Sequence, residues 1–131
     1  MTKYLLDTCS YIWLLTNEQN KLSKKARDAL MSDGSTTYIS IISQIEMTAK
    51  NSRQKIKGLS EPIIHYFKRI RVSSGIELLN LTQEDIEETS NLPKIHSDPF
   101  DRLLISQALN NQMTLISPDE KFLKYPVRVV F

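Results

Sequence analysis

The sequence predicts an α/β fold, a three-layer α/β/α sandwich around a mainly parallel sheet of five strands. Two observations predict it: short β-rich runs alternate with helical patterns along the chain, and no internal repeat or linker-like stretch interrupts them. Strands that alternate with helices pair in parallel through right-handed crossovers. A length of 131 residues fits one domain, and we therefore expect a single domain over residues 1–131.

Strands are expected where aliphatic, aromatic and β-branched residues form short runs between turn residues. In a parallel sheet the carboxyl ends of the strands meet at one edge, and ligands bind there, near the switch in strand order. The residues that follow each strand are therefore the first candidates for function. The predicted strands are residues 3–6, 37–40, 76–79, 114–116 and 127–130.

Capping residues and apolar spacing predict the helices between these strands. Thr8 or Ser10 is expected to cap the first helix, and Ser43 to cap the third, with Glu46 at the spacing of a capping box. Pro62 is expected in the first turn of the next helix, two positions after a serine cap. The first predicted helix ends at residue 15, and the others cover residues 22–31, 44–55, 62–74, 82–90 and 99–110, with one or two turns in 118–123.

Composition excludes several classes of protein. Apolar residues make up 40% of the chain and charged residues 24%, which excludes a disordered chain. The apolar runs are far shorter than the ~20 residues of a membrane span, and Asp7 interrupts the first run before a signal peptide could form. The single cysteine, Cys9, leaves no internal disulfide. We therefore expect a cytoplasmic protein without a membrane partner.

Positive charge is concentrated in one segment of the chain. The net charge is only +2, yet residues 50–71 contain seven basic residues and one acidic residue. Such a segment can follow a phosphate backbone, or it can consist of solvated helix faces. The candidates for contact with a phosphate-bearing substrate are Lys50, Arg53, Lys55 and Lys57.

Acidic residues gather at the predicted carboxyl edge of the sheet. Asp7 follows the first strand, Asp119 follows the fourth, and Glu46 lies in the helix after the second. Asp98 and Asp101 flank the start of the helix that leads into the fourth strand, so they reach the same edge. Each acid taken alone could be a helix cap or a first-turn residue. Their joint position at one edge favours a functional site.

Several carboxylates in one crevice repel each other, and a divalent cation would neutralise them. Donors that are all oxygen select Mg²⁺ or Mn²⁺ over Zn²⁺. The chain has no second cysteine and no histidine pair at the ligand spacing of a zinc site. Because Mg²⁺ usually meets a phosphate-bearing substrate, the pattern suggests hydrolysis of a phosphodiester by a metal-activated water.

Four stretches span nearly the whole chain and carry its most specific pattern. They are Tyr4-Leu5-Leu6-Asp7-Thr8, then Ser40-Ile41-Ile42-Ser43-Gln44-Ile45-Glu46 with Lys50, then His96-Ser97-Asp98-Pro99-Phe100-Asp101-Arg102-Leu103-Leu104-Ile105, and Ser117-Pro118-Asp119 with Phe122. In this order and spacing they resemble a PIN-domain ribonuclease, and more narrowly a VapC-type toxin of a type II toxin–antitoxin system. The third stretch is the most specific of the four.

The resemblance implies an endoribonuclease that needs Mg²⁺ or Mn²⁺ and cleaves RNA to a 5′-phosphate and a 3′-hydroxyl. It implies that Asp7 and Asp101 bind the metal directly and that Glu46 binds it directly or through water. Asp119 would bind a second metal or a metal-bound water, and Asp98 would be either a ligand or the support of one. The implied catalytic residues are Asp7, Glu46, Asp101 and Asp119.

The resemblance also gives roles to two hydroxyls and leaves one histidine without a role. Thr8 would hold a metal-bound water or a phosphate. Ser117, which stands where relatives often carry threonine, keeps the hydroxyl and would serve the substrate in the same way. His96 is close to the acids in sequence, but a metal-dependent nuclease does not need it as a base.

The implied partners are RNA and a small antitoxin protein that holds the enzyme inactive, and a homodimer is also compatible with the resemblance. The apolar run Ile12-Trp13-Leu14-Leu15 exceeds what one narrow buried stripe requires. We therefore expect part of that surface to bind the antitoxin or a second protomer.

Two other functions stay open at this point. A PIN-like fold could bind RNA without cutting it. A receiver-like phospho-switch has a similar size and a similar α/β alternation, but it needs paired acids at the end of its first strand, where this chain has Asp7 followed by Thr8.

Overall fold

The computed structural model describes residues 1–50, 61–95 and 97–131. Its centre is one sheet in the order β3-β2-β1-β4-β5, and each of these neighbouring pairs is parallel. The predicted three-layer α/β/α fold is confirmed, and the described sheet is wholly parallel. The strands are β1 (Lys3–Leu6), β2 (Thr36–Ser40), β3 (Glu77–Leu79), β4 (Thr114–Ile116) and β5 (Val129–Val130).

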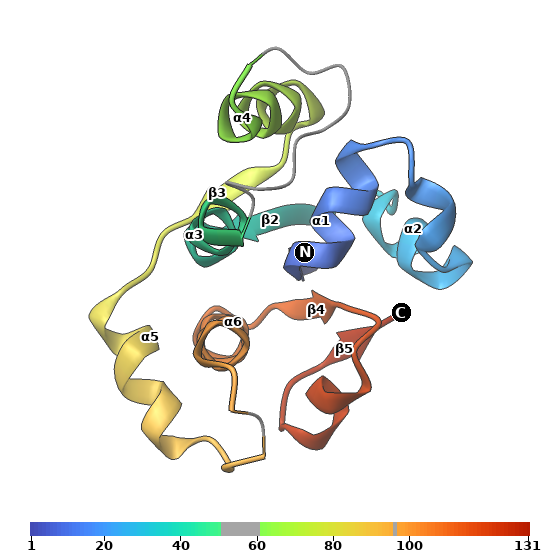
Figure 1. Ribbon diagram of the computed structural model, residues 1–131. Helices are drawn as coiled ribbons and strands as arrows, with labels where there is room; N and C mark the ends of the chain where they lie inside the picture. The colour runs from blue at the N-terminus through green and yellow to red at the C-terminus, as the bar shows by residue number, and fades with distance from the viewer. Residues whose placement is uncertain (51–60, 96) are drawn as a thin grey trace.

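Helices cover both faces of this sheet (Figure 1). The helices α1, α2 and α4 lie on one face, whereas α5 and α6 lie on the other, with α3 beside α6. The helices are α1 (Thr8–Leu15), α2 (Lys24–Leu30), α3 (Ile41–Lys50), α4 (Ile63–Ser74), α5 (Gln83–Glu88) and α6 (Pro99–Asn110). Short 3-10 segments are η1 (Gln19–Lys21), η2 (Thr89–Asn91) and η3 (Glu120–Lys124).

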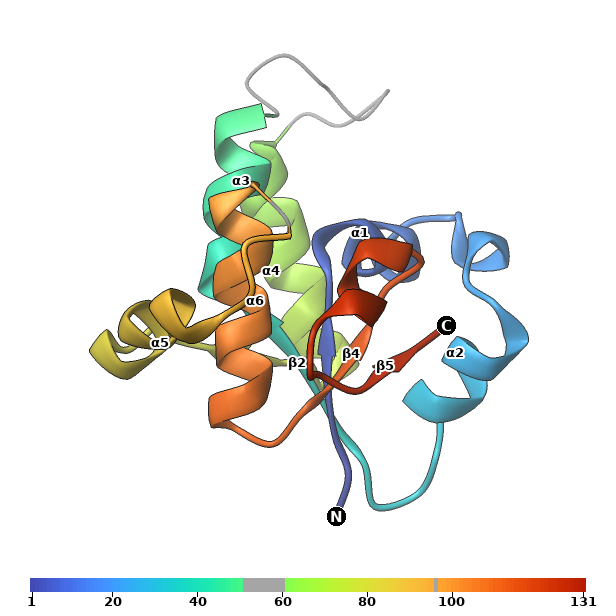
Figure 2. The same ribbon diagram turned by 90° about the horizontal axis from the view of Figure 1, so that it is seen from below.

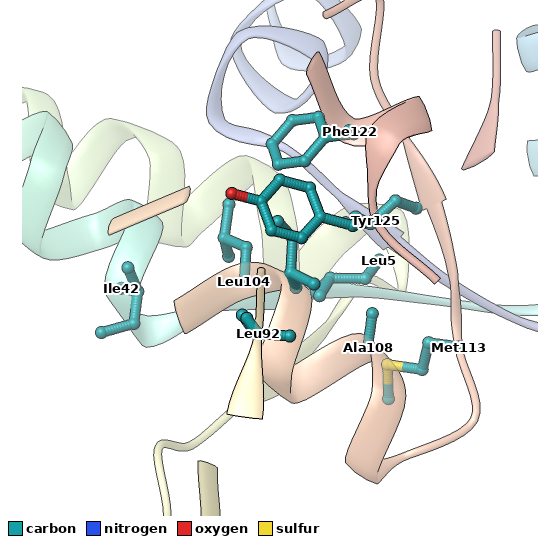
Figure 3. Packing of buried hydrophobic residues seen from close by; sticks show 10 residues of the cluster. Leu5, Ile42, Leu92, Leu104, Ala108, Met113, Phe122 and Tyr125 are labelled. Carbon is teal, nitrogen blue, oxygen red and sulfur yellow. The ribbon is translucent and has the colours of Figure 1, made fainter. Parts of the chain in front are cut away.

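Alternate side chains of the central strands enter two separate cores. In β1, Leu5 packs in the core of α6, Leu6 packs in the core of α1 and α2, and both are completely buried. In β4, Leu115 packs in the core of α6 and Ile116 packs in the core of α1 and α2. Figure 3 shows the first of these cores, in which Leu5 lies with Leu104 of α6. Burial on both faces explains why these strands appear in the sequence as continuous apolar runs.

The strand order determines where a site can form. The chain starts in the middle of the sheet at β1, continues outward to β2 and β3, and returns through α6 to β4 and β5 on the other side. The order therefore reverses between β1 and β4, where Leu6 lies in register with Ile116. The end of α6 is at the opposite edge, because Lys3 at the start of β1 donates to the carbonyl of Asn111 at 3.3 Å. Hence α6 begins at the carboxyl edge (Figure 2).

The first helix is capped by Asp7, which is the alternative role given above for this acid, and the prediction of Thr8 or Ser10 is wrong. α1 begins at Thr8, directly after this cap. The Asp7 carboxylate accepts the backbone N–H of Ser10 at 2.8 Å. All three residues are good caps by type, and the end of β1 at Leu6 leaves the first of them in the capping position.

The predicted start of the third helix is also wrong. α3 begins at Ile41 rather than near Gln44, so Ser43 lies inside the helix and forms no capping box with Glu46. The hydroxyl of Ser40 accepts the backbone N–H of Ile42 at 3.0 Å instead. The predicted end of this helix at residue 55 lies outside the described residues.

The remaining differences concern boundaries. Pro62 occupies the position before α4 rather than its first turn. β3 begins one residue later than predicted, and β5 begins at Val129, since β4 pairs with it only through residues 115–116. The turns predicted in 118–123 form the 3-10 segment η3. In the described part of the chain, none of the helices has the length and apolar character needed to cross a membrane.

Candidate metal centre

Asp7 lies at the reversal between β1 and β4 and is held in one orientation. Its backbone N–H donates to the carbonyl of Ile116 in β4 at 3.0 Å. Its carboxylate accepts the N–H of Ser10 at 2.8 Å and the hydroxyl of Ser117 at 2.7 Å. Only 7% of Asp7 is exposed, so this is a buried carboxylate that donors from two elements orient.

Ser117 connects Asp7 to a second acid. Its buried hydroxyl donates to Asp7 Oδ2 and accepts the backbone N–H of Asp119 at 3.1 Å. Asp119 in turn caps η3 by accepting the N–H of Lys121 at 3.0 Å. The loop after β4 therefore brings one predicted acid and one predicted hydroxyl to the carboxylate that follows β1.

Burial raises the pKa of the Asp7 carboxyl above its ordinary value, and the nearby charge of Asp119 raises it further. The hydrogen bonds from Ser10 and Ser117 lower this pKa, because they favour the ionised form, but the net direction is upward. Ionised Asp7 therefore carries an electrostatic cost in the metal-free protein. A dication beside the two carboxylates would remove that cost, since opposite charge favours the ionised form.

Thr8 links the first helix to the helix that carries Glu46. Its hydroxyl donates to the hydroxyl of Ser43 at 2.9 Å, and Ser43 is fully buried. Because Ser43 precedes Glu46 by three residues, both lie near the same side of α3. Sequence reasoning assigned Ser43 only a capping role. The sequence signal that could have indicated its bond to Thr8 is a hydroxyl residue one turn before an acid on the same helix.

Glu46 and Asp101 lie on two helices that run side by side in opposite directions (Figure 2). Ile42 of α3 and Ile105 of α6 belong to one buried core. Glu46 lies four residues after Ile42, Asp101 lies four residues before Ile105, and residues four apart share a helix face. Glu46 therefore shares a side of α3 with Ile42, Asp101 shares a side of α6 with Ile105, and both sides border this core. Glu46 is only 7% exposed, and Asp101 is half-buried.

Asp98 has a clear structural role. Its carboxylate accepts the N–H of Phe100 at 2.9 Å, and Pro99 takes the first position of α6. A negative charge at this end is also favoured by the helix dipole. The predicted contact of Asp98 with a metal stays a prediction, and His96 lies outside the described residues.

The donor chemistry fits the expected ion, although the described residues do not form a complete ligand group. Within residues 1–50, 61–95 and 97–131, no three Asp, Glu, His or Cys side chains are grouped so that they could hold a metal ion. The acids lie instead as Asp7 near Asp119 and as Glu46 and Asp101 on facing helices. These donors are all carboxylate oxygens, which suit Mg²⁺ or Mn²⁺. The ligand set itself stays a prediction.

The side chains of the basic residues predicted to contact phosphate lie outside what the structure describes. Residues 51–60 and the side chain of residue 50 lie outside the described part of the chain. The stretch stays a prediction from the sequence, and its residues are Lys50, Arg53, Lys55 and Lys57.

The apolar run on α1 is used by the fold more than we expected. Leu15 is only 7% exposed, and residues 12–14 are partly buried against the same core. The Trp13 ring lies 6.4 Å from the ring of Phe131, measured between centroids, so the last residue of the chain packs beside it. A cavity of about 520 Å³ remains next to Leu14 and Leu15, bounded by the ends of α2 and α4.

Solved structures with this fold include several toxin–antitoxin complexes. VapBC2 from Rickettsia felis, bound to a DNA fragment from its promoter, has a TM-score of 0.72 at 19% identity, over 98% of this chain and 97% of that chain. A toxin–antitoxin complex from Klebsiella pneumoniae has a TM-score of 0.64 at 21% identity, over 98% and 96%. DNA-bound VapBC from Salmonella typhimurium has a TM-score of 0.63 at 16% identity, over 98% and 97%.

Sequence comparison gives a more specific result than these structural likenesses, whose low identities establish the fold alone. Among curated proteins, none matches this sequence. Residues 4–127 match the family model of the PIN domain, and this range contains every acid of the candidate site. The chain belongs to the PIN domain family.

Proposed function

We propose that this chain is an endoribonuclease that depends on Mg²⁺ or Mn²⁺ and that it is the toxin of a toxin–antitoxin pair. One observation carries the proposal: the buried Asp7 carboxylate at the β1–β4 reversal, oriented by Ser117 and close to Asp119. Its context is a chain of the PIN domain family. Buried acids with perturbed pKa values at the ligand-binding edge of a sheet are typical of functional sites.

The residues that would hold the dication are the acids of the carboxyl edge. When bound, Mg²⁺ or Mn²⁺ supplies Lewis acidity, which lowers the pKa of water and stabilises the leaving oxygen of a phosphodiester. The all-oxygen donor set selects such a hard ion. The proposed ligands are Asp7, Glu46, Asp101 and Asp119, with Asp98 as a further candidate.

The chain's own side chains would orient these ligands. Ser117 would keep Asp7 and Asp119 at a constant separation, since its hydroxyl contacts both. Thr8 would hold α3, and with it Glu46, against the start of α1 through its bond to Ser43. Ligands fixed before the substrate arrives need little reorganisation during the reaction. The hydroxyls of Thr8 and Ser117 are also our candidates for contact with a phosphate oxygen.

RNA is the proposed substrate, and the cytoplasm is the proposed location. The basic stretch of residues 50–57 would contact the RNA backbone, because lysine and arginine displace the counterions of phosphates. The proposed antitoxin partner rests on solved complexes of the same fold, which pair a toxin with an antitoxin. The cavity of about 520 Å³ beside Leu14, Leu15 and Ile76 is a candidate contact surface for that partner. A homodimer is proposed as a further possibility for the same apolar surface.

Incubation with total cellular RNA tests the proposed activity. With Mg²⁺ or Mn²⁺ present, we expect cleavage that leaves a 5′-phosphate and a 3′-hydroxyl at mapped ends. Excess EDTA, Asp7→Asn and Asp101→Asn should each abolish most of it, whereas Ser73→Ala, at an exposed position on α4, should cut like the wild type. RNA that binds to the wild type and stays uncut would favour the alternative of a non-catalytic RNA-binding module.

A further inference from the structure

A buried polar contact joins the start of α3 to α6. The hydroxyl of Ser40, at the end of β2, donates to Gln107 Oε1 of α6 at 2.5 Å. Both residues have 0% exposure. Gln107 Nε2 also donates to the carbonyl of Asn80, just after β3, at 3.3 Å. One amide side chain therefore ties α6 to the ends of two neighbouring strands.

Packing alone does not explain an amide at this position. Leu104 and Ala108, the neighbours of Gln107 on α6, lie in the apolar core of Figure 3. Burial of an amide costs free energy unless its hydrogen bonds are made, whereas methionine of similar volume would fill the space without that requirement. The amide contributes hydrogen bonds, which have a preferred direction, whereas apolar contacts have none.

The contact gives a common reference point for positions along α3 and α6. Glu46 lies six positions after Ser40, and Asp101 lies six positions before Gln107. Because the two helices run in opposite directions (Figure 2), equal steps away from the contact lead to the same height. At a rise of 1.5 Å per residue, both acids lie roughly 9 Å along the helices from the contact.

We propose that Ser40 and Gln107 are positioning residues that keep Glu46 and Asp101 at the same height and so complete the dication site. The proposal rests on the nuclease function proposed above. The apolar packing between the helices is non-directional, so it would resist a shift of one helix along the other less than a directed hydrogen bond does. Groups that orient metal ligands typically change affinity or activity about 10–100-fold when they are removed.

Gln107→Met tests this role, because it removes the directed contact at similar volume. Asn110→Ala is the matched control: it removes a hydrogen bond from the same helix, but to Asp85 of α5, at 2.9 Å. The melting temperature in EDTA measures general loosening of the fold, and its rise during a titration with Mn²⁺ measures the site. Ser40→Ala removes the same contact from the other side, together with the bond from the Ile42 N–H at the start of α3, and replaces Gln107→Met if that variant does not fold.

We expect both Gln107→Met and Asn110→Ala to melt below the wild type in EDTA. Only Gln107→Met should need more Mn²⁺ than the wild type for the same rise in melting temperature, by about 10-fold or more. With RNA, Gln107→Met should lower kcat and leave KM within about twofold of the wild type, because it does not touch the substrate.

Two results would overturn the proposal and leave the nuclease function intact: wild-type Mn²⁺ affinity in Gln107→Met, or an equal loss of affinity in Asn110→Ala. Either would mean that the Ser40–Gln107 contact only stabilises the fold. A wild-type protein that neither responds to Mn²⁺ nor cuts RNA would remove the proposed function itself, and this inference with it.

Discussion

Removal of the Ser117 hydroxyl is expected to destabilise the protein substantially. Ser117 is 2% exposed, donates to the Asp7 carboxylate at 2.7 Å and accepts the N–H of Asp119 at 3.1 Å. A hydrogen bond to a charged group contributes about 1.5–3 kcal/mol, and a buried partner left unpaired costs a similar amount. For Ser117→Ala we expect the free energy of unfolding to fall by about 2–3 kcal/mol at neutral pH.

This loss converts into a measurable shift of the melting temperature. The entropy of unfolding is roughly 2.1 cal/mol/K per residue, which for 131 residues gives about 0.28 kcal/mol/K. The melting temperature of Ser117→Ala in EDTA should therefore fall by roughly 7–11 °C, as measured by calorimetry. Ser73→Ala removes a serine hydroxyl that bonds the Ile70 carbonyl on an exposed part of α4, and it should change stability by no more than about 0.5 kcal/mol.

The loss should also depend on pH. The Ser117 bond lowers the pKa of Asp7 against the larger effect of burial, so it stabilises the ionised form. The destabilisation by Ser117→Ala is therefore complete above the pKa of Asp7 and shrinks as the pH falls through it. A loss below about 0.5 kcal/mol at neutral pH, or a loss that stays constant on acidification, would refute the reasoning that Ser117 acts through ionised Asp7.

Asp7→Asn should melt higher than the wild type in EDTA at neutral pH, because burial raises the pKa of Asp7 and the amide avoids the cost of the charge. The pKa of Asp7 is higher in the folded protein than in the unfolded chain, so its contribution to wild-type stability is lost as the pH rises from the unfolded-state pKa through the folded-state pKa. Thermal melts of Asp7→Asn should lack this fall. Phe67→Ala removes a ring that is 1% exposed and 5.5 Å from Tyr11, so urea unfolding should reveal a loss of about 3–5 kcal/mol. Charge reversal at Lys55 and Lys57 should weaken RNA binding and flatten its salt dependence in filter binding; an unchanged slope would mark that segment as a solvated face.

The parts of the fold that follow from local pattern could be predicted from the sequence. Pairs such as Leu5-Leu6 and Leu115-Ile116 mark strands, because a central parallel strand is buried on both faces. The position of Asp7 and Asp119 at one edge follows from the alternation of strands and helices, which makes the strands parallel. The placement of these acids after β1 and β4 therefore required no knowledge of tertiary contacts.

The contacts that orient the acids could not be predicted in this way. Ser40 and Gln107 are 67 residues apart, and Thr8 and Ser43 are 35 residues apart. No local pattern encodes such pairs, because they depend on which helices become neighbours in the folded chain. The prediction of Thr8 or Ser10 as the cap of α1 was wrong for a related reason. Asp7, Thr8 and Ser10 are all suitable caps, and the end of β1 decides among them.

Equilibrium binding of Mn²⁺, followed by electron paramagnetic resonance, tests most directly whether acids remote in sequence hold one dication together. The wild type should bind Mn²⁺ saturably and release it to Mg²⁺. Asp7→Asn, on the strand side, and Asp101→Asn, on α6, should each weaken that binding by about 10-fold or more. Wild-type affinity in either variant would contradict the account, because the acid in question would then take no part in holding the metal.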